Sequence, residues 1–395
     1  MRGLMRLFQY ALCCVAGVLA KLLSGSITSR NEILLIRLDA IGDFVIWLDS
    51  AKEFRSLYPN IRITLCVSSA VIHLARTLPH WDDVVAVDLK RFDASFVYRY
   101  QLLRRLRKHG FDTVIQPTFS RVFLHGDAIV WATGGKHCIG SAGDLTNTRS
   151  IFKRVSDTWY TKLVPAAVAP MMELERNVEF IENLSGRVFV ARLPLLPNMG
   201  SLPARLEINA SYFVIFPGAS WSGRQWPAAK FAETVATLHR LTGWVPVLCG
   251  GPGDKLVCQD VIDQSGVTRA INFSGLTTLT ELTEVLRAAK LLISNETSAV
   301  HIAVSVSTPT VCILGGGHYG RFMPYPTRLD GGKSGVAVHK MPCYNCNWRC
   351  TQPHVVGGPV PCISGVTVKS VLERVEVVLS RVENQNTALS ENQTK

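Results

Sequence analysis

The chain has 395 residues, 47% of them hydrophobic and 18% charged, a composition that excludes a disordered or fibrous protein. Its length exceeds one ordinary hydrophobic core and predicts two domains. The net charge of +12 favours anionic partners, such as phosphorylated substrates or an acidic membrane surface. No RNA-binding or helix-turn-helix motif accompanies this charge, so we expect no nucleic acid partner.

Residues 1–29 form a separate apolar segment, in which the largely apolar run 7–20 is too short for a membrane span of about 20 residues. As a helix it gathers Arg2, Arg6 and Lys21 near one narrow face, which favours a helix lying in a membrane interface. A cleaved signal peptide, a short span and an ordinary packed helix are the alternatives. Eleven cysteines, an odd number, favour a reducing compartment over a disulfide framework.

Residues 30–200 alternate between strand-like and helical segments, which predicts a parallel sheet covered by helices on both faces. The stretch 140–205 is less regular, and its Pro- and Gly-rich end marks the domain boundary. We expect strands at 32–38, 61–67, 83–89 and 111–117, with helices between them that include 71–78 and 95–110.

Residues 205–380 repeat this alternation and predict a second α/β domain, followed by a polar, disordered tail at 381–395. Ligands of doubly wound sheets bind beyond the carboxyl ends of the strands, so the loops at those ends are the candidate sites. We expect strands at 212–218, 244–251, 270–275, 291–295 and 308–316, and helices at 227–243, 254–266, 278–290, 298–307 and 367–385.

The loop after the first strand places Asp39, Gly42 and Asp43 at the start of a helix. The helix dipole favours a carboxylate there, so either acid can serve as a cap. However, the glycine lets a substrate approach the backbone closely, and a carboxylate in the position of Asp43 can accept a proton from a hydroxyl nucleophile. The residues alone leave both roles open for Asp43.

Two loops of the second domain also suit a nucleotide. Ser220 and Arg224 lie in the loop before the helix at 227, where a hydroxyl and a cation favour an anionic group, although a solvated loop is the alternative. Gly251 lies in a glycine-rich turn that allows close backbone approach, and Asp254 after it can bind ribose hydroxyls. The spacing of that turn is not a dinucleotide-binding fingerprint.

A third loop of this domain joins the strand at 291–295 to a helix whose first N–H groups can hold a diphosphate. His301, one turn into that helix, either faces the ligand or packs in the protein interior. The candidate ligand contacts of this loop are Asn295, Glu296, Thr297, Ser298 and His301.

A cysteine cluster follows the last predicted strand. Cys343, Cys346, Cys350 and Cys362 give the spacing C-x2-C-x3-C-x11-C, which is compatible with structural zinc, while unligated or redox-active thiols are the alternative. Nothing in this spacing assigns the cluster to a catalytic step.

Four segments in this order resemble glycosyltransferase family 9, the ADP-heptose:lipopolysaccharide heptosyltransferases. They are "ILLIRLDAIGDFV", "FPGASWSGRQWPAAKFAE", "LCGGPGD" and "SNETSAVHIAVSVSTPTVCILG", spread over residues 33 to 315. The resemblance implies a GT-B fold, in which two Rossmann-like, doubly wound α/β domains face a central cleft. It also implies an inverting transfer that needs no metal cofactor.

The resemblance assigns roles to individual residues. It implies that Asp43 is the general base and that Arg224 contacts phosphate. Thr297 and Ser298 match the positions whose backbone amides hold the diphosphate, and Asp254 matches an acid near the ribose. The chain departs from the family pattern at Glu296, where the family has Asp, and at Ser298, where it has Gly. ADP-heptose is therefore the expected donor, with another nucleotide sugar as the alternative.

The resemblance implies a lipid-linked saccharide acceptor, which gives the apolar N-terminal segment and the basic surface a shared role. We therefore expect a cytoplasmic protein that is peripheral on the inner face of the cytoplasmic membrane. Two other functions stay open: a nucleotide-sugar epimerase of the same fold, and a non-catalytic membrane-associated binding protein.

Overall fold

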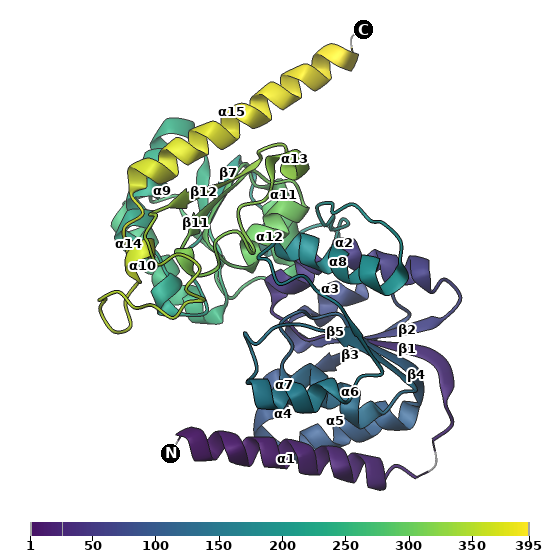
Figure 1. Ribbon diagram of the computed structural model, residues 1–395. Helices are drawn as coiled ribbons and strands as arrows, with labels where there is room; N and C mark the ends of the chain where they lie inside the picture. Colours follow the sequence, from purple (N-terminus) through teal and green to yellow (C-terminus); the bar gives the residue numbers. More distant parts are fainter. Residues whose placement is uncertain (1, 26, 394–395) are drawn as a thin grey trace. The chain divides into compact units, whose positions relative to one another are not determined.

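The computed structural model describes residues 2–25 and 27–393, without the side chains of residues 2–10, 386 and 388–393 (Figure 1). The chain divides into two units. Unit 1 consists of Met1–Ala169 and Glu173–Ala191, and unit 2 consists of Pro170–Met172 and Arg192–Lys395. The main crossing between them falls at residue 192, ahead of the boundary near 200 that the sequence predicts. Each unit contains one six-stranded sheet.

The sheet of unit 1 has the strand order β3-β2-β1-β4-β5-β6, and all of its strand pairs are parallel. Its central strand β1 is buried from Ile33 to Arg37, as expected for a strand with helices on both faces of the sheet. The strands are β1 (Arg30–Arg37), β2 (Arg62–Ser68), β3 (Asp83–Val87), β4 (Phe111–Gln116), β5 (His137–Ser141) and β6 (Lys162–Val164).

The helices of unit 1 follow local sequence signals. Ser95 caps α5 by accepting a hydrogen bond from the N–H of Tyr98, and Gly110 ends the helix with a left-handed φ of 81°. The helices are α1 (Arg2–Leu22), α2 (Ile41–Leu57), η1 (Ser69–Val71), α3 (Ile72–Arg76), α4 (Leu89–Ala94), α5 (Phe96–His109), η2 (Phe123–Asp127), α6 (Ala128–Thr133), α7 (Ser150–Asp157) and α8 (Glu173–Ser185).

The sheet of unit 2 has the strand order β12-β11-β10-β7-β8-β9, which is the order of unit 1 repeated, and its pairs are again parallel. Its core gathers Phe213, Trp226 and Phe231 between the sheet and α9. The strands are β7 (Tyr212–Phe216), β8 (Val245–Leu248), β9 (Ile271–Asn272), β10 (Leu292–Asn295), β11 (Thr310–Leu314) and β12 (Ser334–Val338).

The helices of unit 2 include one with a complete capping box: Thr278 and Glu281 bond reciprocally at the start of α11. The helices are η3 (Ala204–Leu206), η4 (Ser222–Arg224), α9 (Ala228–Thr242), η5 (Pro252–Asp254), α10 (Lys255–Ser265), α11 (Leu279–Ala288), α12 (Ser298–Ser305), η6 (Gly316–His318), α13 (Thr327–Asp330), α14 (Pro361–Ser364) and α15 (Val368–Gln393).

The sequence predicts both a helix to residue 385 and a polar, disordered tail over 381–395; α15 continues to Gln393, so the disorder is wrong for residues 381–393. The polar composition suggested disorder, but Glu, Gln, Leu and Ala are good helix formers. A tertiary contact also holds residue 385, whose side-chain amide donates to the carbonyl of Gly331 at 2.8 Å. Residues 394–395 lie outside the described part of the chain.

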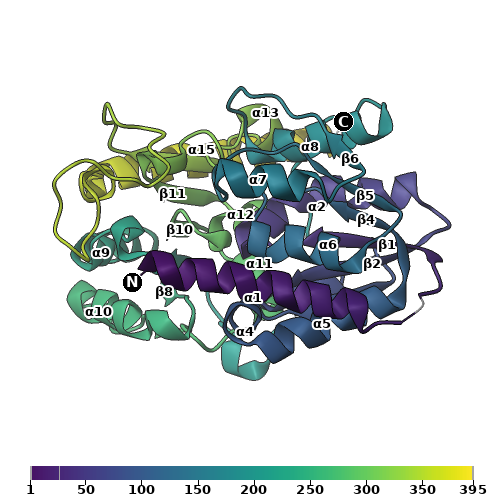
Figure 2. The ribbon, with the colours of Figure 1, turned by 60° about the horizontal axis from the view of Figure 1, so that its bottom comes forward.

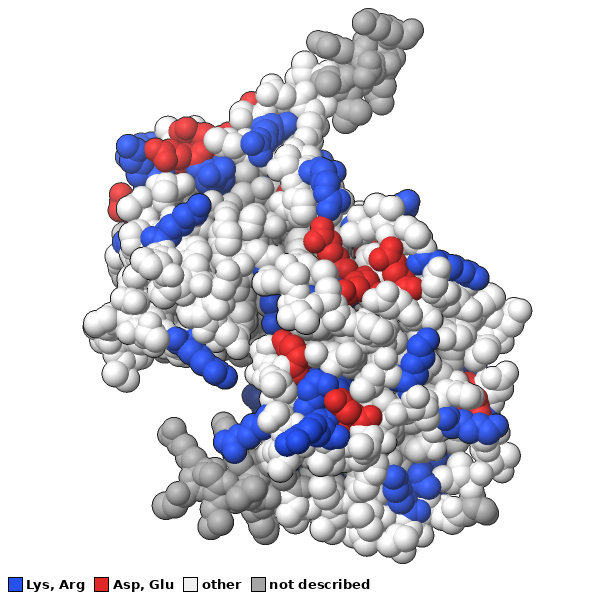
Figure 3. Space-filling view, in the orientation of Figure 1, with Lys and Arg blue, Asp and Glu red and all other residues white. Residues whose placement is uncertain are grey.

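The N-terminal helix α1 packs along α5 in unit 1 (Figures 1 and 2). Cys13, Ala16 and Ala20 are buried, and the Lys21 ammonium lies 4.3 Å from the centre of the Trp131 ring. The polar face predicted for this helix also involves Arg2 and Arg6, whose side chains lie outside the described residues (grey in Figure 3). None of the helices within the described residues is both long enough and apolar enough to span a membrane.

Candidate active site

Both sheets reverse their strand order beside their first strand, between β1 and β4 in unit 1 and between β7 and β10 in unit 2. Ligands of doubly wound sheets bind at the carboxyl ends of the strands at this reversal. In unit 1 the residues that meet there are Asp39, after β1, and Thr118, after β4. In unit 2 they are Arg224, after β7, and Glu296, after β10.

Arg37, the last residue of β1, organises the first of these places. Its side chain is 1% exposed, and its Nε lies 2.7 Å from Oδ2 of Asp39. Its Nη1 lies 3.3 Å from the side-chain oxygen of Asn177 in α8, and its Nη2 lies 3.4 Å from the backbone oxygen of Asp43. Asp39 also accepts a hydrogen bond of 3.2 Å from Thr118. Asp39 therefore joins the loops after β1 and β4 through partly buried polar contacts.

Asp43 lies in the first turn of α2, and its residue is half-buried. The N-cap position of this helix is Ala40, which makes no side-chain cap. A carboxylate in the first turn is stabilised by the positive end of the helix dipole, so this position favours the ionised form that a general base needs. Gly42 beside it is buried, so the backbone at this corner is closely packed.

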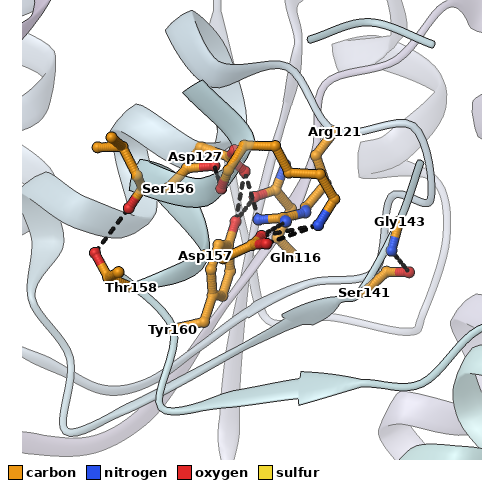
Figure 4. A network of polar contacts seen from close by, with 11 residues as sticks. Gln116, Arg121, Asp127, Ser141, Gly143, Ser156, Asp157, Thr158 and Tyr160 are labelled. Atoms are coloured by element: carbon orange, nitrogen blue, oxygen red, sulfur yellow. Dashed lines mark hydrogen bonds and ion pairs between the residues drawn. The ribbon is translucent and has the colours of Figure 1, made fainter. Parts of the chain in front are cut away.

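A buried polar network lies at the carboxyl ends of β4 and β5 and holds the loop after β4 (Figure 4). Arg121 is 2% exposed and pairs with Asp127 at 3.3 Å and with Asp157. The hydroxyl of Tyr160 lies 2.6 Å from Asp127 and also contacts Gln116. Burial raises the pKa of Tyr160 well above its usual value, so the phenol keeps its proton as a donor.

Sequence reasoning missed this network and the Arg37 cluster. Arg37 and Asp39 stand in a segment that the sequence singled out, but the partners that hold them do not: Asn177 is 140 positions from Arg37 and Thr118 is 79 positions from Asp39. The only local signal was a charged residue at the end of an apolar strand.

In unit 2, Arg224 and Glu296 form an ion pair beside the start of α12. The Arg224 guanidinium lies 3.3 Å from Oε2 of Glu296 and donates to the backbone oxygen of the same residue at 2.5 Å. Glu296 is 4% exposed, and within the described residues neither of its carboxylate oxygens accepts a hydrogen bond. Burial raises the pKa of Glu296 to about 7, although the Arg224 charge acts in the opposite direction.

Two of the predicted ligand contacts are internal to unit 2. Asn295 is fully buried; its amide donates to the Pro217 carbonyl at 2.7 Å and accepts from the N–H of Trp226 at 3.1 Å. His301 is 4% exposed and lies 3.0 Å from the Tyr325 hydroxyl. Burial lowers the pKa of His301 to about 3, so the ring is neutral. Both side chains are buried and support the loop; for His301 this is the packed alternative that the sequence left open.

The other predicted contacts are more open. Thr297 and Ser298 are half-buried at the start of α12. Thr297 is the N-cap residue, and its side chain does not accept a hydrogen bond from the first N–H groups of the helix. Ser220 is exposed in the loop after β7. The Asp254 carboxylate accepts the N–H of Gly251 at 2.8 Å, which closes the glycine-rich turn after β8. These groups bring a cation, the first N–H groups of α12 and a carboxylate to one edge of the unit 2 sheet.

The four cysteines do not build the predicted zinc site. Cys343, Cys346 and Cys350 are half-buried, whereas Cys362 is buried, and its sulfur accepts the N–H of Gly316 at 3.4 Å. Among the described residues, no three His, Cys, Asp or Glu side chains converge to hold a metal ion. Cys343, Cys346 and Cys350 nevertheless lie near enough to Cys362 to add to the effect of burial, which raises the pKa of its thiol.

Residues 99–347 match the model of glycosyltransferase family 9 (heptosyltransferase), which is more than half of the chain. The chain belongs to this family. It is therefore a glycosyltransferase, which decides the choice that the sequence left open between transfer, epimerisation and a silent binding protein. The match does not include Asp43, so it leaves the role of that residue a prediction.

Relatives of this glycosyltransferase include lipopolysaccharide heptosyltransferase 3 of Escherichia coli, 24% identical over 69% of this chain and 80% of the relative. Lipooligosaccharide heptosyltransferase 2 of Haemophilus ducreyi is 18% identical over 70% of this chain and 81% of that protein. Among solved structures, Escherichia coli heptosyltransferase WaaC with ADP-2-deoxy-2-fluoro heptose superimposes with a TM-score of 0.65 at 16% identity, covering 87% and 99% of the two chains. This likeness confirms the GT-B fold predicted from the sequence.

Proposed function

We propose that this glycosyltransferase transfers a heptose from ADP-heptose to a saccharide of a lipopolysaccharide core. The observation that carries the proposal is the placement of Arg224 beside the first turn of α12, a cation next to N–H groups that the side chain of the N-cap residue Thr297 does not cap. That combination binds a diphosphate. Relatives named as lipopolysaccharide heptosyltransferases, and a neighbour solved with an ADP-heptose analogue, support heptose and ADP as the donor groups.

In the proposed reaction, an acceptor hydroxyl attacks the anomeric carbon of the heptose while the Asp43 carboxylate takes up the hydroxyl proton. The bond between the anomeric carbon and the diphosphate oxygen breaks, and ADP leaves with the bonding electron pair. Arg224 and the amides of Thr297 and Ser298 stabilise the charge that develops on ADP. A single displacement of this kind inverts the anomeric configuration.

The remaining predicted contacts complete the donor site in this proposal. Asp254, at the turn closed by Gly251, lies at the carboxyl edge where ribose hydroxyls would bind, and Ser220 is open to the phosphates. Gly42 is buried, so in this proposal it allows close packing at the corner that carries Asp43. Asn295 and His301 act indirectly, because they hold the loops that carry Arg224 and Glu296.

The test is transfer of heptose from ADP-heptose to purified heptose-deficient lipopolysaccharide core, with the product mass and the anomeric configuration measured by mass spectrometry and NMR. We expect Asp43→Asn to lower kcat by about 10²- to 10⁴-fold, the usual contribution of a general base, with little change in the KM for the donor. Glu53→Gln, which removes a carboxylate from the same helix, is the matched control. An unaltered rate in Asp43→Asn would exclude Asp43 as the base.

We also propose that the outer face of α1, together with α5, binds the anionic cytoplasmic leaflet of the membrane. Val15 and Leu22 are 48% and 72% exposed on α1. Arg104 of α5 donates to the backbone of Leu23 at 3.5 Å, and Lys108, one turn further along α5, is exposed. Apolar side chains flanked by cations suit an interface with acidic headgroups.

Sedimentation with phosphatidylglycerol-containing vesicles tests this surface. We expect the protein to bind these vesicles, to release them as salt is raised, and to bind pure phosphatidylcholine vesicles weakly. Leu22→Glu should abolish binding, whereas Leu256→Glu, which changes an even more exposed leucine on α10, should not. Equal binding of both vesicle types or of both variants contradicts the proposal.

A further inference from the structure

The cysteine-rich loop, residues 343–350, lies on the backbone that follows β11. The N–H of Asn345 donates to the Gly316 carbonyl at 2.6 Å, and the N–H of Asn347 donates to the Gly317 carbonyl at 3.0 Å. A side chain at Gly317 would overlap the Trp348 ring. The glycines after β11 therefore allow this loop to reach the carboxyl edge of the unit 2 sheet.

Within this loop, Trp348 is held in an unusual conformation. Its φ of 58° lies in the left-handed region that a tryptophan rarely adopts, so its surroundings must hold it there. The indole N–H donates to Nδ1 of His318 at 3.3 Å, and Nε2 of His318 lies 2.5 Å from the Asn347 side-chain oxygen. Burial lowers the pKa of His318, which favours the neutral ring that this pair of contacts requires.

The face of Trp348 is turned toward Arg224. The guanidinium carbon lies 4.9 Å from the centre of the indole ring, within the range of a cation–π contact. Trp221 meets the same ring edge-on, with centroids 6.0 Å apart and planes at 77°. The Arg224 guanidinium therefore packs against the indole face, and its polar partners are the backbone oxygen and the carboxylate of Glu296.

We infer that Trp348 is a positioning residue for the donor diphosphate: its indole face fixes the plane of the Arg224 guanidinium, so that the N–H groups point where phosphate oxygens bind. This inference rests on the proposed binding of a diphosphate at Arg224. A guanidinium whose plane is already fixed loses less conformational freedom when it forms paired bonds to phosphate. The cysteine-rich loop is therefore part of the donor site, and Trp348 itself lies one residue beyond the segment that the family model matches.

Calorimetric titration of the full chain with ADP, and separately with inorganic pyrophosphate, tests this role. Trp348→Leu keeps apolar bulk and loses the aromatic face, so we expect about a two- to thirty-fold weaker affinity, the range of a cation–π contact. Trp348→Phe keeps a ring and should stay near the wild type. Tyr344→Phe alters the same loop without touching Arg224 and is the matched control. In an Arg224→Ala background, Trp348→Leu should have no further effect.

The outcomes separate this role from the proposed function. Equal losses in Trp348→Leu and Trp348→Phe, or the same loss with and without Arg224, would show that the ring does not act through the guanidinium. Unchanged affinity in Trp348→Leu would also overturn the inference. If the wild-type protein binds pyrophosphate but not ADP, only the proposal of an ADP-linked donor is contradicted. The affinities of the Trp348 variants are then compared with pyrophosphate as the ligand. Binding of neither probe overturns both proposals.

Discussion

Replacing Glu296 by Gln should remove a pH dependence from donor binding. In the unliganded protein the Glu296 carboxylate is the acidic partner of Arg224, and burial raises its pKa from 4.5 to about 7. A diphosphate at Arg224 brings a second anion next to a buried carboxylate, which favours the protonated form of Glu296. Donor binding should therefore be accompanied by proton uptake, and affinity should fall as pH rises through 7.

The size of the effect follows from the fraction of Glu296 that is ionised before binding. With a pKa of about 7, roughly a tenth is ionised at pH 6 and roughly nine-tenths at pH 8, so affinity should fall about tenfold over this range. Neighbouring groups do not mimic this titration. Burial lowers the pKa of His301 to about 3 and that of His318 below its usual value, and it raises the pKa of the Cys312 thiol well above its usual value.

The assay is calorimetric titration with an ADP-sugar, whose diphosphate does not titrate between pH 6 and 8, in buffers of different ionisation enthalpy. For each ADP-sugar bound, the wild-type protein should take up close to one proton at pH 8 and roughly a tenth of a proton at pH 6. Glu296→Gln should take up none at either pH. A wild-type affinity that is independent of pH, or one that rises with pH, would refute the reasoning. An equal pH dependence in Glu296→Gln would assign the titration to another group.

Four further outcomes are expected. Because folding raises the pKa of Glu296, its contribution to stability is fully present below pH 4.5 and is lost as pH rises through 7. In urea unfolding, the free energy of unfolding of the wild type should therefore fall by up to about 3 kcal/mol over this range, and that of Glu296→Gln should not. Arg121→Met strands the Asp127 charge in the interior and should lower the free energy of unfolding by about 3–5 kcal/mol; a loss near zero would contradict the network. Thr278→Ala removes the cap of α11 and should cost about 1 kcal/mol in the same measurement, while an unchanged value would mean that the cap is not stabilising. Treatment with EDTA should leave the transfer rate unchanged, because Arg224 and α12 supply the positive charge for ADP; a loss restored by Mg²⁺ would contradict this.

The sequence predicted the alternation of strands and helices well, because buried parallel strands such as Ile33–Ile36 are continuous apolar runs with turn residues at their ends. It was less informative where elements are short or polar. The less regular stretch 140–205 contains α7, β6 and α8, and β6 has only three residues. The predicted strand at 270–275 pairs over two residues only. Such elements are set by tertiary contacts and not by local periodicity.

The candidate site shows a similar division. Sequence reasoning found the segments that carry Asp43, Arg224 and Glu296, because they follow strands and precede helices. It did not find Trp348, because nothing local links a cysteine-rich loop to an arginine more than a hundred residues earlier. It named Asn295 as a ligand contact and left His301 open between a ligand contact and a packed residue; both side chains are buried and support the loop.

The two acids of the loop after β1 can now be given separate roles. Asp39 is held by the buried Arg37 and by Thr118, so its carboxylate serves to join two loops of unit 1. Removing its charge would leave the buried Arg37 cation without its nearest partner, 2.7 Å away, and would destabilise the loop between β1 and α2. Asp39→Asn should therefore lower stability together with activity, whereas Asp43→Asn should lower kcat with the fold intact. If Asp39→Asn instead abolished transfer without changing the unfolding midpoint, Asp39 would be the better candidate for the base.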